Sequence, residues 1–202
     1  MQTPDFDAPA PKVQSPSALA HVVLRTPNMK TMEQFYITFL GGRVAHNNNI
    51  LSFITYDEEH HRIALISLPG KGPGPGPGPS PKVPSSYGLE HIAFSFPTLS
   101  DLLLSYRQRK ARGISPVWCV NHGPTTSIYY KDPDGNVLET QVDNFDTAEE
   151  ANGFMATEEF AQNPIGTDFD PEVVIERLRA GEDERGLKMR VECGPRGPPE
   201  LD

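Results

Sequence analysis

Three side chains of the kinds that bind transition metals occupy related places in the chain. His21 and His91 each follow a leucine by two residues and precede a proline by six, so they fall at equivalent points of a repeated pattern. Glu139 lies in a third apolar run, residues 137–142. Two imidazoles and one carboxylate form the facial set that binds non-haem Fe(II) and leaves three coordination positions open for substrate and dioxygen. The sequence therefore offers His21, His91 and Glu139 as ligands of one metal ion.

The stretch that carries Glu139 predicts a β-hairpin. Residues 127–142 contain two runs rich in strand-forming residues, and Asp132–Gly135 between them combines the proline, aspartates and glycine of a tight turn. Asp132 and Asp134 are interpreted as turn residues. A lone glutamate on a strand is usually a solvated surface group. The case for Glu139 as a ligand therefore depends on the two histidines rather than on its own run.

The elements that must position these residues occur twice, in the order strand, helix and three strands. In each half a β-rich run precedes a stretch with apolar residues at helical spacing that ends at glycine, and three short β-rich runs follow. The first half predicts strands at 19–25, 43–46, 50–56 and 62–68, around a helix from Asn28 to Gly41. The second half predicts strands at 89–94, 117–120, 127–130 and 137–142, around a helix from Leu99 to Gly113.

Two such units define one domain of the α+β class. We expect module one at residues 18–69, a Gly/Pro linker at 70–86 and module two at 87–143. Each open sheet has a face that it cannot bury alone, so the two pseudo-symmetric βαβββ modules are expected to form a curled sheet around a shared, metal-containing cavity. The first strands of the two modules would carry the histidines, and the last strand the glutamate.

The segments outside the two modules differ from them in composition. Residues 1–17 are rich in proline, and residues 182–202 combine charge with glycine and proline, so we expect both to be disordered. Residues 144–181 contain several phenylalanines, which predict a tail packed on the domain or on a second subunit, with a helix at 171–180.

The negative charge of the chain lies in its tail. The formal net charge is −9, and residues 143–202 carry 16 acidic and 6 basic side chains. Without a basic stripe to neutralise phosphates, nucleic acid is not expected as a partner. No apolar run is long enough to span a bilayer and the first residues lack a signal-peptide pattern, so we expect a soluble, cytoplasmic protein with no membrane partner. In that compartment Cys119 and Cys193 are expected to be free thiols.

The paired modules, the two histidines and the spacing Tyr-x3-Pro-x-Gly-x3-Glu that ends at Glu139 resemble the vicinal-oxygen-chelate superfamily of glyoxalases, bleomycin resistance proteins and extradiol dioxygenases. The resemblance covers residues 18–144 and is strongest to single-domain extradiol enzymes of the catechol 2,3-dioxygenase or biphenyl-2,3-diol 1,2-dioxygenase kind. It implies an Fe(II) enzyme, with Mn(II) as an alternative, that opens a catechol-type ring beside its two hydroxyls with dioxygen. We also expect a homodimer or higher homo-oligomer.

The resemblance also assigns roles outside the metal ligands. His61, in a His-x-x-Ala segment, takes the place of the active-site acid/base, because a neutral imidazole can take a proton from a catechol and later return it. We expect His61 rather than His60, since adjacent side chains of a strand point to opposite faces. Tyr129 takes the place of a tyrosine whose hydroxyl binds substrate oxygens. His122 takes the place of a further histidine of the site.

Two other functions on the same fold stay open. A glyoxalase-like isomerase or lyase needs a fourth metal ligand from the last strand of module one, and residues 62–68 offer no carboxylate there. A metal-free binding or resistance protein would use the cavity to sequester a small molecule and would not need both histidines together with Glu139. A serine hydrolase is not supported, because the chain lacks a Gly-x-Ser-x-Gly motif. The pattern does not distinguish single-ring, biaryl and polyketide-derived diols as substrates.

Overall fold

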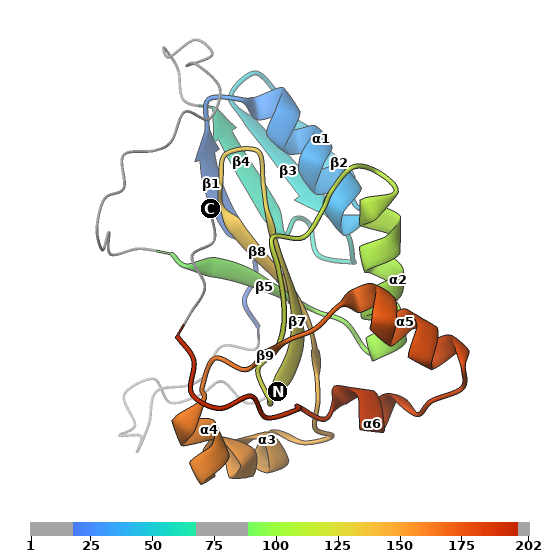
Figure 1. The fold of residues 1–202 in the computed structure, drawn as a ribbon. Helices are drawn as coiled ribbons and strands as arrows, with labels where there is room; N and C mark the ends of the chain where they lie inside the picture. Colours follow the sequence, from blue (N-terminus) through green and yellow to red (C-terminus); the bar gives the residue numbers. More distant parts are fainter. Residues whose placement is uncertain (1–17, 68–88, 198–202) are drawn as a thin grey trace, which may run out of the picture.

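The computed structural model describes residues 18–67 and 89–197 (Figure 1). The predicted disordered segment 1–17 and the Gly/Pro linker 70–86 lie outside these residues. Cys119 and Cys193 are free thiols, as expected. Among the helices of the described ranges, none is long and apolar enough to cross a bilayer.

Module one is a four-stranded sheet with one helix packed on it. Its elements are β1 (Val22–Thr26), α1 (Met29–Leu40), β2 (Arg43–Asn47), β3 (Leu51–Thr55) and β4 (Ile63–Ser67). The strand order is β1-β4-β3-β2, with β1 parallel to β4 and the other neighbours antiparallel. The first strand of the module is therefore an outer strand, and its parallel partner is the last.

Module two repeats this arrangement. Its elements are β5 (His91–Ser95), α2 (Leu99–Lys110), β6 (Trp118–Asn121), β7 (Thr125–Lys131) and β8 (Val137–Asp143). The order β5-β8-β7-β6 again places the first strand parallel to the last and outside it. The predicted α+β fold of two βαβββ modules is confirmed, with one sheet in each module.

Local sequence signals explain where the module helices begin and end. α1 ends at Gly41, whose φ of +63° is left-handed and whose N–H donates to the Ile37 carbonyl. α2 begins after Thr98, whose side chain accepts a hydrogen bond from the Asp101 N–H. Gly41 thus ends α1 as predicted, whereas Asn28 makes no side-chain cap on α1, and α2 ends at Lys110, before the predicted Gly113.

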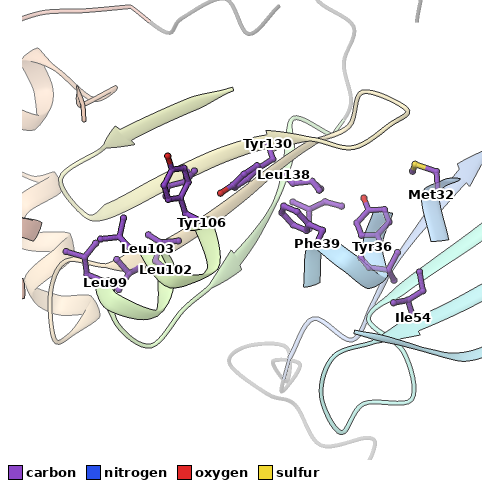
Figure 2. Packing of buried hydrophobic residues seen from close by; sticks show 14 of the residues in the cluster. Met32, Tyr36, Phe39, Ile54, Leu99, Leu102, Leu103, Tyr106, Tyr130 and Leu138 are labelled. Atoms are coloured by element: carbon purple, nitrogen blue, oxygen red, sulfur yellow. The ribbon is translucent and has the colours of Figure 1, made fainter. Parts of the chain in front are cut away.

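One apolar core joins the two modules (Figure 2). Phe39 of α1 packs edge-to-face on Tyr130 of β7, with ring centroids 5.3 Å apart. Arg109 of α2 is buried beside this contact, and its guanidinium lies 4.2 Å from the Phe39 ring centroid. Its Nε also donates to the Phe39 carbonyl oxygen at 3.0 Å. The strands of module two are thus held against the helix of module one.

The tail continues beyond module two and packs on it. Its elements are α3 (Ala148–Met155), α4 (Glu158–Gln162), β9 (Thr167–Asp168), α5 (Pro171–Arg179) and α6 (Glu184–Lys188), drawn from orange to red in Figure 1. β9 pairs antiparallel with β6 and adds a fifth strand to the sheet of module two. α5 matches the helix predicted at 171–180, begins after the Asp170 cap and buries Ile175.

The prediction of disorder from residue 182 to 202 is wrong for the part up to residue 197. α6 forms there, and Leu187 is 9% exposed within the apolar core. The Arg190 side chain is 1% exposed and bonds backbone oxygens of residues 122 and 163. Charge and glycine content do not reveal such contacts, because the partners lie far away in the sequence.

Candidate active site

A carboxylate and an imidazole meet on the two parallel strands of module two. β5 and β8 pair with Ala93 opposite Glu139, which places His91 two residues away on the same face. His91 Nε2 lies 3.1 Å from Glu139 Oε2. Glu139 is 5% exposed, whereas the His91 side chain is 35% exposed, so the pair is open to solvent at the histidine. Two adjacent donors of these types can bind a divalent transition metal.

Tyr129 completes the hydrogen bonding of this carboxylate. The β-hairpin places Tyr129 of β7 directly opposite Glu139 of β8, and the tyrosine hydroxyl donates to Glu139 Oε1 at 2.9 Å. Burial raises the pKa of Tyr129 well above its usual value, and the charge and hydrogen bond of Glu139 raise it further. The hydroxyl therefore stays protonated and is available as a donor.

His122 lies on the other side of the same hydroxyl. Its Nε2 is 3.0 Å from the Tyr129 oxygen, and its Nδ1 is 2.5 Å from the Ile165 carbonyl oxygen. Burial lowers the pKa of His122, although the Ile165 carbonyl and the charge of Glu139 oppose this shift. The Tyr129 hydroxyl thus lies within hydrogen-bond distance of both Glu139 and His122. The structure brings the predicted His122 into contact with the predicted Tyr129.

Trp118 belongs to this group and was not predicted from the sequence. Its ring stacks on Tyr129 with centroids 5.0 Å apart, and it meets His122 edge-on at 5.5 Å. The strand register places Trp118 opposite Tyr129, which in turn lies opposite Glu139, so the three residues form one row across the sheet. Pairing the predicted strand at 117–120 with the predicted hairpin strand that carries Tyr129 would have been the way to predict Trp118 from the sequence.

The other predicted residues gather in module one. The His21 ring lies 4.3 Å from the His61 ring and 6.3 Å from the His60 ring. His61 stacks on Phe53 with centroids 4.3 Å apart and an interplanar angle of 9°. Burial lowers the pKa of His61, and the neighbouring His21 and His60 lower it further. His61 is therefore neutral near pH 7 and able to accept a proton.

The expectation that His60 and His61 point to opposite faces is wrong. Their rings are stacked, with centroids 4.4 Å apart and an interplanar angle of 16°. The alternation rule applies within a strand, but β4 begins at Ile63 and both histidines lie in the loop before it. His60 is the more exposed of the two, with 68% of its side chain accessible.

The structure assembles part of the predicted ligand set. His91 and Glu139 are adjacent, and one imidazole beside one carboxylate fits a ferrous ion in donor type. Across residues 18–67 and 89–197, however, no three histidine, cysteine, aspartate or glutamate side chains come together as a metal site. His21 lies just before β1, not on it as was expected, and it contacts His61 instead.

The pairing registers also locate the module-one counterpart of Glu139. In module two the glutamate pairs with the residue two positions after His91, which is Ala93. In module one the residue two positions after His21 is Val23, and it pairs with Ala64. A methyl group therefore stands where a fourth, glyoxalase-type carboxylate ligand would come from this module.

A model of the family described as Glyoxalase/Bleomycin resistance protein/Dioxygenase superfamily matches residues 18–140. The chain belongs to this superfamily. The matched range runs from the start of module one into β8 and contains all six residues predicted for the site, so the resemblance seen in the sequence is confirmed.

Two relatives from Rhodococcus globerulus bear the names Biphenyl-2,3-diol 1,2-dioxygenase 3 and Biphenyl-2,3-diol 1,2-dioxygenase 2. The first is 46% identical over 173 residues, which cover 86% of this chain and 88% of the relative. The second is 44% identical over 162 residues, which cover 80% and 82%. Among solved structures, Lactoylglutathione lyase from Agrobacterium tumefaciens aligns with 64% of this chain and 96% of that chain, at 18% identity and a TM-score of 0.48. The two relatives confirm the predicted enzyme class, extradiol dioxygenase.

Proposed function

We propose that the chain binds one Fe(II) and opens the aromatic ring of a biphenyl-2,3-diol or related catechol beside its hydroxyls, with dioxygen as co-substrate. The observation that carries the proposal is the series of contacts from His91 to Glu139, from Glu139 to Tyr129 and from Tyr129 to His122, each of which is 3.1 Å or shorter. It supplies metal donors at one end and a protonated hydroxyl beside them. The names of the two relatives support a diol of this kind.

His91, Glu139 and His21 are the proposed ligands of the metal. Because the His21 side chain is exposed, its contact with His61 is not fixed by burial in the core. A ferrous ion bound by two imidazoles and a carboxylate supplies the electron-transfer chemistry that lets a catechol react with dioxygen. Mn(II) is the alternative metal, because it accepts the same donor types.

His61 is proposed to take a proton from a catechol hydroxyl and to return it to the product. Its ring stacks on Phe53 and on His60, with centroids 4.3 and 4.4 Å away, which restricts the plane of the imidazole. A positioned imidazole of this kind contributes to catalysis by general acid–base transfer. His61 contacts His21, so it lies next to one proposed ligand.

Tyr129 is proposed to bind an oxygen of the diol or of the ring-opened product. Its hydroxyl already has two partners, Glu139 and His122, and can exchange one of them for a substrate oxygen. His122 then keeps the hydroxyl oriented while Tyr129 changes partner. These roles need a proton held at the Tyr129 oxygen, which its raised pKa ensures.

The proposal is tested by loading the purified chain with Fe(II) under anaerobic conditions and adding biphenyl-2,3-diol or single-ring catechols under air. We expect dioxygen uptake together with a yellow ring-opened product, and neither after treatment with a chelator. An iron-loaded chain that consumes no dioxygen with any diol of the panel would contradict the proposal.

A cytoplasmic location and a homodimer or higher homo-oligomer are further parts of the proposal. Light scattering of the purified protein tests the assembly.

A further inference from the structure

The C-terminal tail reaches both side chains that flank Tyr129. The Ile165 carbonyl oxygen lies 2.5 Å from His122 Nδ1. Three residues later, Asp168 Oδ1 accepts a hydrogen bond from Trp118 Nε1 at 2.7 Å. Both partners belong to residues 163–168, which include β9 and run beside β6.

We propose that the tail segment 163–168 is part of the active site, where Ile165 sets the tautomer of His122 and Asp168 fixes the ring of Trp118. The catalytic consequence rests on the proposed function, whereas the positioning itself does not. The segment thereby acts on Tyr129 from two sides without touching a substrate. Its residues, and Arg190 which holds them, are positioning residues rather than catalytic ones.

The tautomer follows from the chemistry of the Ile165 carbonyl. A carbonyl oxygen can accept a hydrogen bond but cannot donate one, so His122 Nδ1 must carry the hydrogen. In a neutral imidazole Nε2 is then an acceptor, and it lies 3.0 Å from the Tyr129 oxygen. In the opposite tautomer His122 Nε2 would donate a hydrogen bond to the Tyr129 oxygen, and Glu139 would be the one acceptor of these two for the Tyr129 proton. The backbone of the tail therefore decides whether Tyr129 has a second acceptor.

The Ile165 carbonyl is held in place by a tight turn. Asn163 is fully buried, and its side chain accepts from the Gly166 N–H at 2.8 Å and donates to the Gly166 carbonyl at 3.1 Å. Gly166 has a φ of +105°, and a Cβ on it would lie 2.1 Å from the Asn121 carbonyl oxygen. The turn thus packs directly against the backbone that carries His122.

Arg190 fastens this turn to the loop that carries His122. Its side chain is 1% exposed, and Nη1 donates to the His122 carbonyl at 3.0 Å and to the Asn163 carbonyl at 2.8 Å. The same guanidinium lies 5.1 Å from the ring centroid of Phe154 in α3. One buried side chain therefore joins the end of the tail, the turn and the loop. A lysine could not reproduce this forked set of donors.

Asp168 is oriented in a similar way. Arg196 Nη2 donates to Asp168 Oδ2 at 3.0 Å, and Arg196 Nη1 lies 2.9 Å from Oδ1, the oxygen that also accepts from the indole N–H of Trp118. Trp118 in turn stacks on Tyr129. Removing the carboxylate would free the indole ring that forms one wall beside the tyrosine.

The tautomer is measured by nitrogen-15 NMR of histidine-labelled, metal-free full chain, with His122 assigned from its missing signals in His122→Gln. We expect the Nδ1–H tautomer in the natural chain and a shift toward Nε2–H in Arg190→Ala, Arg190→Lys and Asn163→Ala. Arg179→Ala is the matched control, because that arginine makes an exposed contact with Glu176 in α5. It should leave the His122 signals unchanged.

The contact between Asp168 and Trp118 is measured separately by tryptophan fluorescence, because Trp118 is the one tryptophan of the chain. Asp168→Ala should shift the fluorescence emission to longer wavelength, whereas Asp168→Asn keeps an oxygen acceptor and should stay close to the natural spectrum. In the iron-loaded enzyme Arg190→Ala should lower kcat by about 10- to 100-fold, the usual effect of losing a group that orients a metal-site side chain. KM for the diol should change much less.

The two readouts separate this proposal from the proposed function. If the natural chain cleaves no diol but shows the Nδ1–H tautomer and loses it in the folded Arg190 variants, the positioning stands and the proposed reaction fails. The positioning is overturned if folded Arg190→Ala and Asn163→Ala keep both the tautomer and kcat. Circular dichroism of each variant establishes that it is folded, and Arg190→Lys serves where a truncation to alanine unfolds the tail.

Discussion

Tyr36 in α1 donates a hydrogen bond to Asp132, in the turn between β7 and β8, at 3.0 Å and across 96 residues of sequence. Tyr36 is 0% exposed and Asp132 4% exposed. The other oxygen of Asp132 accepts from the backbone N–H groups of Asp134 and Asn136 and so closes its own turn. One carboxylate therefore shapes the hairpin that carries Glu139 and ties that hairpin to module one.

Removing the hydroxyl in Tyr36→Phe should lower the free energy of unfolding by about 1.5–3 kcal/mol, the usual contribution of a hydrogen bond to a charged group. Burial and the adjacent Asp132 raise the pKa of Tyr36, so the natural residue remains a donor. Urea unfolding measures the difference. Tyr106→Phe is the control, because its hydroxyl bonds Glu172, a carboxylate that is 32% exposed. An equal loss in both variants would contradict the special role of Asp132.

The proposed metal site predicts the iron content of alanine variants. His91→Ala, Glu139→Ala and His21→Ala should each fail to retain stoichiometric Fe(II) after anaerobic loading and desalting, because each removes one donor of a three-donor set. His46→Ala is the control, since that histidine lies on β2, at the other edge of the module-one sheet from β1. Full iron in all three variants would show that the site is wrong. Full iron in His21→Ala alone would leave the metal to the pair in module two.

Local chemistry explains which parts of the fold could be predicted from the sequence. The Asp132–Gly135 turn was predicted because proline, aspartate and glycine specify it within four residues. Both modules were predicted because each repeats one order of strands and helix. The position of Glu139 opposite Tyr129 depends on the register of the hairpin, which the structure shows and the sequence analysis did not predict.

Contacts between distant backbone groups explain what the sequence did not reveal. The orientation of His60 was predicted wrongly because both histidines lie in the loop before β4, where the alternation of side chains along a strand does not apply. The contact of Ile165 with His122 involves a main-chain oxygen, which carries no residue-specific signal. Arg190 lies in a segment of disordered composition, and its burial depends on oxygens of His122 and Asn163.

The stacked histidines of module one give an unequal pair of variants. His61→Ala should retain iron and bind the diol but lower kcat by about 10²–10⁴-fold, the usual contribution of a positioned proton-transfer group. His60→Ala should lower kcat much less, because 68% of its side chain is exposed and its main effect is to support the His61 ring. Steady-state kinetics with one diol measures both. Loss of activity in His60→Ala alone would assign the proton transfer to His60.

The ion pair of Asp168 and Arg196 predicts an acid-dependent loss of stability. Burial raises the pKa of Asp168, but Arg196 and the Trp118 N–H outweigh burial and hold this pKa below its usual value of 3.8. A carboxylate with a depressed pKa in the folded state stabilises the protein above its unfolded-state pKa. That contribution is lost as the pH falls through the lower, folded-state pKa. Stability should therefore decrease in acid through this residue.

Asp168→Asn should accordingly be less stable than the natural chain at about pH 7, and the difference between them should shrink as the pH falls below the unfolded-state value of about 3.9. Urea unfolding at a series of pH values measures it. Asp146→Asn is the control, because its partner Arg185 and Asp146 itself are 76% and 67% exposed, and such surface pairs contribute little. A difference for Asp168→Asn that stays constant into strong acid would mean that the carboxylate acts through its shape and not through its charge.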